Sequence, residues 1–369
     1  MKNKQSRYSL FLKRIAQLQI QYPLLVLLTI VLLTLLFAIP AQDVQTVASL
    51  EQMMPQDTPA IKAFNDLRDQ ELGRDAIAVL LRIDTQGHNQ RVNILGEDTD
   101  QYVQILKKNL LEETSVHEVQ THLQNPAFIN QDQTEVLLIA YTDAAGDDTR
   151  MKRLASRVSY LSEQAVPYAT KPYLTGTPII QQRLGEYIQT DQQRTRLAST
   201  LLVLLITALL FGFTSSLIPI LTVTLSVSWL YGTMGLFGLP ISTLAGGVAA
   251  MVIGIGIDFA IHLMNKFKFE RKNGLSIPEA IQEAVVHTGT ALSVTALTTG
   301  AAFLSFLVGV MPEMGRFGIL MALGIFYALV LTLMALPALL VLEERLIAYF
   351  SKKARFGIEG EYKLVEDKQ

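Results

Sequence analysis

The sequence predicts an integral membrane bundle of six transmembrane α-helices that carries a separate α+β domain outside the membrane. Four long stretches, at 15–42, 197–265, 284–312 and 317–342, contain a single Asp, Glu, Lys or Arg, which is Asp258. The polar segment between the first two stretches has about 155 residues, enough for a domain of its own. An ordinary soluble protein and a disordered chain are both excluded, because half the residues are hydrophobic and are concentrated in these stretches.

The number of spans follows from the lengths of the apolar stretches. A hydrocarbon core of about 30 Å requires roughly 20 apolar residues in a helix. The second stretch is long enough for three spans, and turn signals at 212–216 and 235–240 separate them. The predicted spans are therefore about 22–40, 197–213, 217–236, 241–264, 284–310 and 317–342. This divides the chain into a cytoplasmic amphipathic segment (1–21), the first span (22–41), an exported α+β domain (42–196), spans two to six (197–343) and a cytoplasmic tail (344–369).

The orientation follows from lysine and arginine near the span ends, because such residues remain cytoplasmic. The first 14 residues contain five Lys or Arg and no acid, and the segments 266–272 and 345–355, after the fourth and sixth spans, each contain four Lys or Arg. Residues 43–196 contain 22 acidic and 15 basic residues. We therefore expect both termini in the cytoplasm and the large domain outside. A cleaved signal peptide is the alternative interpretation of the first span.

The exported domain shows alternating helical and strand patterns. Apolar residues recur every three or four positions in 60–72, 101–112 and 147–164, which predicts helices. Strand patterns occupy 76–83, 116–122, 135–142 and 172–175. The order contains the split βαβ arrangement, which predicts a ferredoxin-like domain. A further polar helix, 179–196, leads directly into the second span and would couple the domain mechanically to the membrane.

Asp258 is the strongest candidate for a functional residue, because an Asp within a span costs about 2.5–3.5 kcal/mol on insertion scales. Gly247, Gly254, Asp258 and His262 share one helical stripe, and Gly256 is nearby. Small residues on this face allow close helix packing, so we expect another helix to cover Asp258. Burial would raise the carboxyl pKa towards the physiological range. The alternatives are an acid that only bonds a neighbouring helix, and a solvated or packing role for His262.

The fifth span is rich in hydroxyl groups that could face this acid. Thr288, Thr295 and Thr299 lie on one face of the predicted helix. As a set they could carry a proton through a dry bundle. The alternative for each is a hydrogen bond back to the preceding turn of its own helix.

Several other kinds of chemistry are excluded by composition. The chain has no cysteine, so it has no disulfide, thiolate nucleophile or cysteine-ligated metal site. Gly254 and Gly256 lie within an apolar span and are packing residues, not a phosphate-binding loop. We expect no enzymatic activity, no cofactor, no metal ion and no nucleic-acid partner.

Several segments together resemble one transporter superfamily. They are GIGIDFAIHLMNKFKFERKNG at 254–274, LTGTPIIQQRL at 174–184, HTGTALSVTALTTGAAFLSFL at 287–307, the Tyr22–Pro23 start of the first span, and the FGIL and LPALL segments of the sixth. This set resembles the resistance-nodulation-division (RND) superfamily, in the branch of mycobacterial-large (MMPL) and hopanoid-type exporters. Spans two to six also resemble the sterol-sensing domain.

The resemblance implies proton-driven export of lipids or other hydrophobic molecules through a periplasmic porter domain, in a bacterial inner membrane. It implies that Asp258 carries the proton, with Thr295 as its best-placed hydroxyl partner and His262 as a further candidate. Phe259 departs from the tyrosine common at this position and cannot donate a hydrogen bond, so the relay must differ or use water.

A second departure is length, because a typical member has two such units and this chain has one. We therefore expect a homodimer in which two copies of the fourth helix face each other. A periplasmic or outer-membrane partner that receives the cargo is left open. The alternatives are a non-transporting scaffold or sensor of the sterol-sensing type and a protein-export accessory like SecD or SecF.

Overall fold

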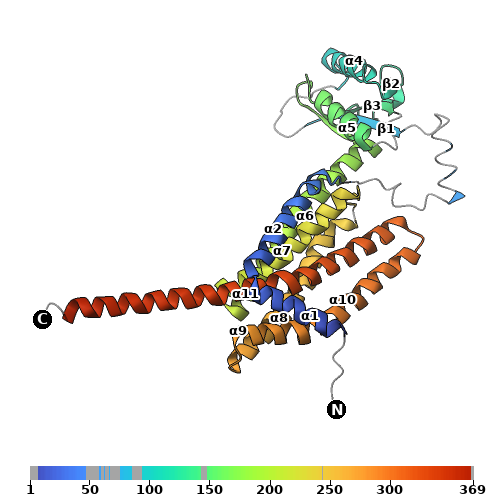
Figure 1. The fold of residues 1–369 in the computed structure, drawn as a ribbon. Helices are drawn as coiled ribbons and strands as arrows, with labels where there is room; N and C mark the ends of the chain where they lie inside the picture. Colours follow the sequence, from blue (N-terminus) through green and yellow to red (C-terminus); the bar gives the residue numbers. More distant parts are fainter. Residues whose placement is uncertain are drawn as a thin grey trace. The chain divides into compact units, whose positions relative to one another are not determined.

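A computed structural model of the chain describes residues 7–46, 58–59, 62, 66, 75–84, 94–142, 148–242 and 244–366. The chain forms two compact units, residues 1–46 with 190–369 and residues 47–189, each of which is considered by itself (Figure 1). The helix expected at 60–72 lies largely outside the described residues. We refer to residues 47–189 as the α+β unit and to the remainder as the helical unit.

The described residues of the α+β unit include a four-stranded antiparallel sheet and two helices that pack against it. Its elements follow in the order β1 (Asp75–Ile83), α4 (Glu97–Leu111), β2 (Val116–Thr121), β3 (Glu135–Thr142), α5 (Asp148–Ser162) and β4 (Thr170–Gly176). The strand order in the sheet is β2-β3-β1-β4. All four predicted strands are confirmed with bounds close to those expected, as are the helices α4 and α5.

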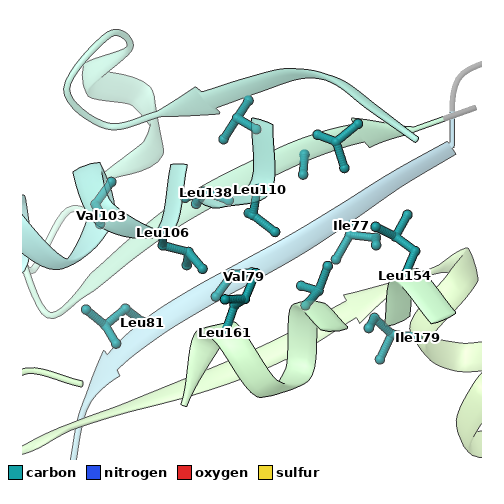
Figure 2. Close-up of a cluster of buried hydrophobic side chains, with 14 of the residues drawn as sticks. Ile77, Val79, Leu81, Val103, Leu106, Leu110, Leu138, Leu154, Leu161 and Ile179 are labelled. Carbon is teal, nitrogen blue, oxygen red and sulfur yellow. The ribbon is translucent and has the colours of Figure 1, made fainter. Parts of the chain in front are cut away.

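The core of this unit lies between one face of the sheet and both helices (Figure 2). Alternate residues of β1 (Ile77, Val79 and Leu81) are buried against Leu106 of α4 and Leu161 of α5. This pattern follows from strand geometry, because successive side chains point to opposite faces. At the edge of the core, the Tyr102 hydroxyl donates to the Ser162 carbonyl at 2.6 Å, and burial raises the pKa of Tyr102 to about 12.

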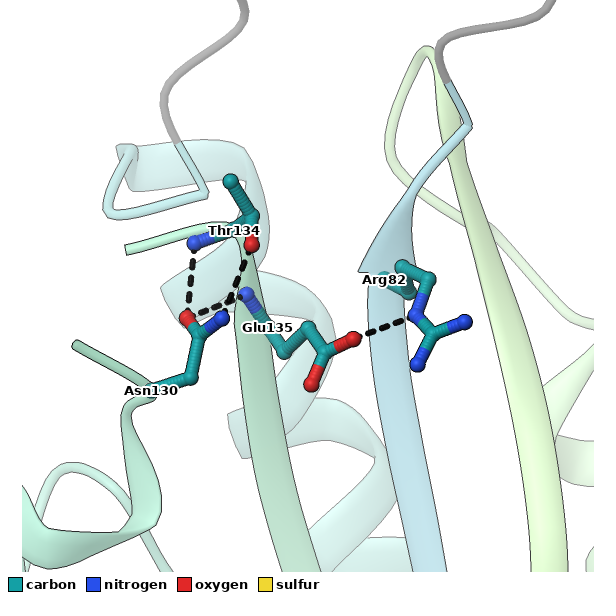
Figure 3. Close-up of polar contacts among 4 residues, drawn as sticks. All are labelled: Arg82, Asn130, Thr134 and Glu135. Atoms are coloured by element: carbon teal, nitrogen blue, oxygen red, sulfur yellow. Dashed lines mark hydrogen bonds and ion pairs between the residues drawn. The ribbon is translucent and has the colours of Figure 1, made fainter. Parts of the chain in front are cut away.

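The turn before β3 is stabilised by hydrogen bonds to the side-chain amide of Asn130 (Figure 3). The Asn130 carboxamide oxygen accepts hydrogen bonds from the backbone N–H groups of Thr134 and Glu135, at 2.8 and 2.9 Å. Glu135 also pairs with Arg82, the residue opposite it on β1. These contacts fix the register at the start of the β1–β3 ladder.

Among the residues that the structure describes, six helical segments are long and apolar enough to cross a membrane, which confirms the predicted multi-span bundle. They are α2 (Pro23–Ala38), α6 (Thr177–Phe211), α7 (Phe213–Leu236), α8 (Val248–Lys272), α10 (Gly289–Leu304) and α11 (Pro312–Glu366). The segments of α7, α8 and α11 form the centre, each with more than half of its most apolar window buried within the chain. Those of α2, α6 and α10 lie at the periphery and are largely exposed. The polar helix expected at 179–196 and the second span form one continuous helix, α6, whose residues belong to both units.

Short elements connect and brace these spans. The amphipathic helix α1 (Arg7–Gln21) precedes α2, which begins at Pro23 because proline favours the first helical turn. The short helix α9 (Ile277–Glu283) begins with a capping box between Ser276 and Glu279, and a π-helical turn (Ala284–Thr288) joins it to α10. At the end of α6, the Lys268 ammonium lies 3.4 Å from the Phe211 carbonyl oxygen and contacts its ring.

Close helix contacts in this unit depend on glycine. A Cβ added to Gly324 of α11 would lie 2.3 Å from Val252 of α8, and one at Gly235 of α7 would lie 1.7 Å from the Pro40 carbonyl oxygen. Beside the second contact, Trp229 stacks on Phe37 at 5.4 Å and donates a hydrogen bond to the Thr34 hydroxyl at 2.9 Å. The single tryptophan therefore attaches α2 to the bundle.

Candidate functional site on helix α8

Helix α8 has two faces with different surroundings. One face is buried in the bundle and includes Val252, Gly256, Phe259 and Leu263. A Cβ at Gly256 would lie 3.1 Å from the Ala328 Cβ of α11, so this glycine is required by packing within the chain. Phe259 is 3% exposed and thus belongs to this inner face.

The opposite face of α8 is an exposed stripe formed by Gly247, Met251, Gly254, Asp258 and His262. The spacing of three and four residues places them along one side of the helix. A Cβ added to Gly247 or Gly254 would meet no atom within 4 Å. The packing of this chain therefore explains Gly256 but not the two glycines of the exposed stripe.

Asp258 lies at the centre of the exposed stripe. Among the residues that the structure describes, its carboxylate makes no hydrogen bond or ion pair. In particular, it does not pair with the imidazole of His262, one turn away on the same stripe. The expectation that another helix covers Asp258 is thus not met within a single chain. A carboxylate facing hydrocarbon would be unstable, so this surface requires either a protein partner or water.

Four hydroxyl groups of α10 donate to backbone carbonyl groups one turn earlier in the chain. Thr295 is exposed and donates to the Ala291 carbonyl at 3.2 Å, and Thr298 donates to the Val294 carbonyl at 3.1 Å. Thr290 and Ser293 bond back in the same way. Within the described part of the chain no hydrogen bond joins Thr295 to Asp258. One chain therefore presents the acid and the hydroxyl on two helices without connecting them.

Two buried polar groups of the bundle were not singled out from the sequence. Gln19 of α1 is fully buried and donates to the Leu333 carbonyl at 2.6 Å. Glu313, in the first turn of α11, is also buried and pairs with Arg316 at 2.8 Å. Pro337 could have suggested the first contact, because it leaves the Leu333 carbonyl without its helical donor. For Glu313 the sequence carries no comparable signal.

The described residues contain no group of three or more His, Cys, Asp or Glu that could hold a metal ion. On the exposed stripe, Asp258 lies one turn from Gly254 on one side and one turn from His262 on the other. Such an arrangement suits proton binding and close contact with another helix.

Comparison with known proteins identifies the relatives of this chain. The model of the MMPL family matches residues 52–357. The chain belongs to the MMPL family. This confirms the resemblance drawn from the motifs around Asp258, and as an MMPL protein the chain is a multi-pass membrane protein.

Individual MMPL-type relatives differ in length. The membrane protein MJ1562 of Methanocaldococcus jannaschii is 32% identical over 375 residues, which cover 93% of this chain and 97% of that protein. The sulfolipid-1 exporter MmpL8 of Mycobacterium tuberculosis is 25% identical over 354 residues, 90% of this chain but 31% of the exporter. The hopanoid transporter HpnN of Rhodopseudomonas palustris is 30% identical over 122 residues, 33% of this chain and 14% of the transporter. The chain thus spans nearly all of MJ1562 and less than a third of MmpL8.

Proposed function

We propose that this MMPL protein is a proton-driven transporter of lipids or similar hydrophobic molecules that works as a homodimer. In this proposal both termini lie in the cytoplasm, the six spans cross a bacterial inner membrane, and the α+β unit is a ferredoxin-like porter domain in the periplasm. Two relatives are named as a sulfolipid-1 exporter and a hopanoid transporter, which supports a hydrophobic cargo. The strand order β2-β3-β1-β4 with two helices on one face supports the porter-like domain.

The observation that carries the proposal is the position of Asp258. It is the only Asp, Glu, Lys or Arg in the four apolar stretches, and it is exposed on the outer face of α8. An unpaired carboxylate there would cost about 2.5–3.5 kcal/mol in lipid, so Asp258 does not stabilise the fold of the single chain and a functional role accounts for it better. A carboxyl that gains and loses a proton at such a site can couple a proton gradient to movement of the helix.

The homodimer is supported by the glycines that flank this acid. A glycine within a helix costs about 1 kcal/mol relative to alanine, and Gly247 and Gly254 have no neighbour in the chain that requires them. A second α8 packed on the exposed stripe would require small residues at these positions. It would also bring two Asp258 carboxylates together as a coupled pair, because like charges resist double ionisation.

In this arrangement the second copy, or water, supplies the hydrogen-bond partners that the Asp258 carboxylate lacks within one chain. Thr295 and His262 are the candidate partners of Asp258 in the relay. Phe259 cannot serve, since it is buried on the opposite face and has no hydrogen-bond donor. Water entering the dimer interface would replace the donor that tyrosine provides elsewhere in the family.

The test is transport by protein reconstituted in liposomes with an imposed pH gradient. Asp258→Asn should reduce gradient-dependent movement of a fluorescent lipid and the accompanying proton flux to background, because the amide cannot carry a proton. The matched control is Asp191→Asn, which makes the same change at an exposed polar position of α6. This control should transport as the wild type does.

The result separates the leading proposal from the alternatives. Full activity of Asp258→Asn would refute proton coupling through this residue. If the wild type itself moved neither lipid nor protons, a scaffold or sensor function would replace transport. Stimulation of protein export without lipid movement would instead favour an accessory of the SecD and SecF type.

A further inference from the structure

Helix α5 of the α+β unit has an unusually basic outer face. Its inner face, with Leu154 and Val158, is buried in the core. Arg150, Arg153 and Arg157 are exposed on the other side. Their spacing of three and four residues brings the guanidinium groups to the same side of the helix.

These arginines line a hollow in the surface rather than a flat face. The cavity has a volume of about 550 Å³ and is bounded by Arg150, Arg153, Leu154 and Arg157 of α5 and by Glu113, Thr114 and Ser115 of the turn between α4 and β2. Among the described residues the lining therefore carries three guanidinium groups and one carboxylate. We call this cavity the arginine pocket.

Several contacts order the walls of the arginine pocket. Arg157 pairs with Glu113 at 3.0 Å and lies over the Tyr160 ring, 5.7 Å from its centroid, so two neighbours restrict its side chain. Leu154, only 4% exposed, forms an apolar part of the wall anchored in the core. Ordered walls lower the entropic cost of binding a ligand.

We propose that the arginine pocket binds a phosphate or sulfate ester, with an anionic lipid head group as the ligand it accommodates. Guanidinium groups bind tetrahedral oxyanions through paired, charge-assisted hydrogen bonds. The hydroxyls of Thr114 and Ser115 can donate to further oxygens, and Glu113 can accept from hydroxyls of a head group. The volume lies within the range of about 300–1,000 Å³ typical of small-molecule sites and exceeds what a bare phosphate requires. The binding site itself does not depend on the proposed transport function. That the bound lipid is also the transported molecule rests on that proposed function.

Binding is measured calorimetrically on the full chain in a neutral detergent, with two probes. The probes are inorganic phosphate and dihexanoyl phosphatidylglycerol, with zwitterionic dihexanoyl phosphatidylcholine as the comparison lipid. Arg153→Gln should weaken phosphatidylglycerol binding about tenfold, because it removes one charge-assisted contact. Arg183→Gln, which removes an exposed arginine of α6 that does not line the pocket, is the matched control and should bind as the wild type does.

A second variant, Glu113→Gln, should change the affinity for phosphatidylglycerol in the opposite direction. The Gln amide oxygen can still accept hydrogen bonds from Arg157 and from head-group hydroxyls, but the substitution removes the negative charge that repels the anion, so phosphatidylglycerol binding should tighten about threefold. A general loss of folding would weaken binding in both variants, whereas the proposal requires changes in opposite directions. Arg153 is exposed, so its substitution leaves the core of the α+β unit intact.

The probes distinguish the sources of the anion. Binding of phosphatidylglycerol that depends on Arg153 and is stronger than that of phosphate or phosphatidylcholine supports the head-group site. Equal, Arg153-dependent binding of both anionic probes would overturn the head-group assignment in favour of a free oxyanion. Wild-type affinity in Arg153→Gln, or an equal loss in Arg183→Gln, would overturn the pocket altogether.

Failure of the pocket and failure of transport are separable. Asp258→Asn should bind phosphatidylglycerol like the wild type, because the measurement involves no gradient. Intact binding in a protein that transports nothing would reject the transport proposal and leave the pocket standing. Transport without Arg153-dependent binding would reject the pocket alone.

Discussion

At the residue scale, the most informative contact joins Gln19 of α1 to helix α11. Pro337 has no N–H, so the Leu333 carbonyl lacks the donor that an α-helix normally provides. The Gln19 side-chain amide lies 2.6 Å from this oxygen and 3.2 Å from the Met334 carbonyl oxygen. A residue of the amphipathic helix therefore completes the hydrogen bonding of a span more than 300 residues away.

This contact predicts a loss of stability that depends on Pro337. Gln19→Leu should lower the free energy of unfolding by about 1–3 kcal/mol, because it leaves a buried carbonyl without a donor. Gln17→Leu, the same change on the exposed side of α1, should have little effect. Thermal unfolding in detergent measures both. In a Pro337→Ala background the cost of Gln19→Leu should shrink, since the new N–H can bond Leu333; an unchanged cost would contradict this origin.

At the element scale, the two faces of α8 predict different outcomes for similar substitutions. Gly256→Leu should lower the free energy of unfolding by about 1–3 kcal/mol, because its side chain would press on Ala328 and Val223. Gly254→Leu has open space in the chain and should leave the stability of the protomer unchanged or slightly raised. It should instead weaken self-association. Thermal unfolding and analytical ultracentrifugation in detergent separate the effects, and a destabilised protomer in Gly254→Leu would contradict the assignment of faces.

The elements themselves were largely predictable, because their signals are local. Strand-like apolar runs at 76–83 and 135–142 predicted β1 and β3, and the absence of charge predicted the spans. The strand order followed only through the split βαβ arrangement and not from any single strand. The Gln19–Leu333 contact was not predictable, since it joins two distant segments. The spacing of Gly254 and Asp258 indicated a shared stripe but not whether that stripe faces α11 or lies outside the bundle. Only the packing of the other face of α8 decides this.

The arginine pocket was missed for a related reason. Arg150, Arg153 and Arg157 are an ordinary solvated helix face when the sequence of α5 is considered alone. The cavity exists because the turn with Glu113 and Thr114 lies beside that face in the folded unit. A site built from two segments about 40 residues apart, which the Arg157–Glu113 ion pair joins, has no signature within either segment.

At the scale of the whole molecule, the proposed homodimer predicts which surface is shared. The sequence has no cysteine, so a single introduced cysteine has no partner within its own chain, and a disulfide-linked dimer of this protein must join two copies. A two-fold axis along the exposed stripe would bring the two Gly254 positions close together, and a disulfide needs Cα atoms within about 4.4–6.8 Å. Gly254→Cys should therefore give a covalent dimer in native membranes under mild oxidation.

The control for this cross-link is Leu297→Cys on α10. Leu297 is 72% exposed and lies on a different helix from the exposed stripe, so chance collisions in the membrane should affect it at least as strongly as Gly254. Dimers should form efficiently for Gly254→Cys and only slowly for Leu297→Cys. Because the amide of Asn can still pack at the interface, Asp258→Asn should not abolish the Gly254→Cys cross-link. Efficient cross-linking at Leu297 with none at Gly254 would place the interface on α10, and the two Asp258 carboxylates could then not act as a pair.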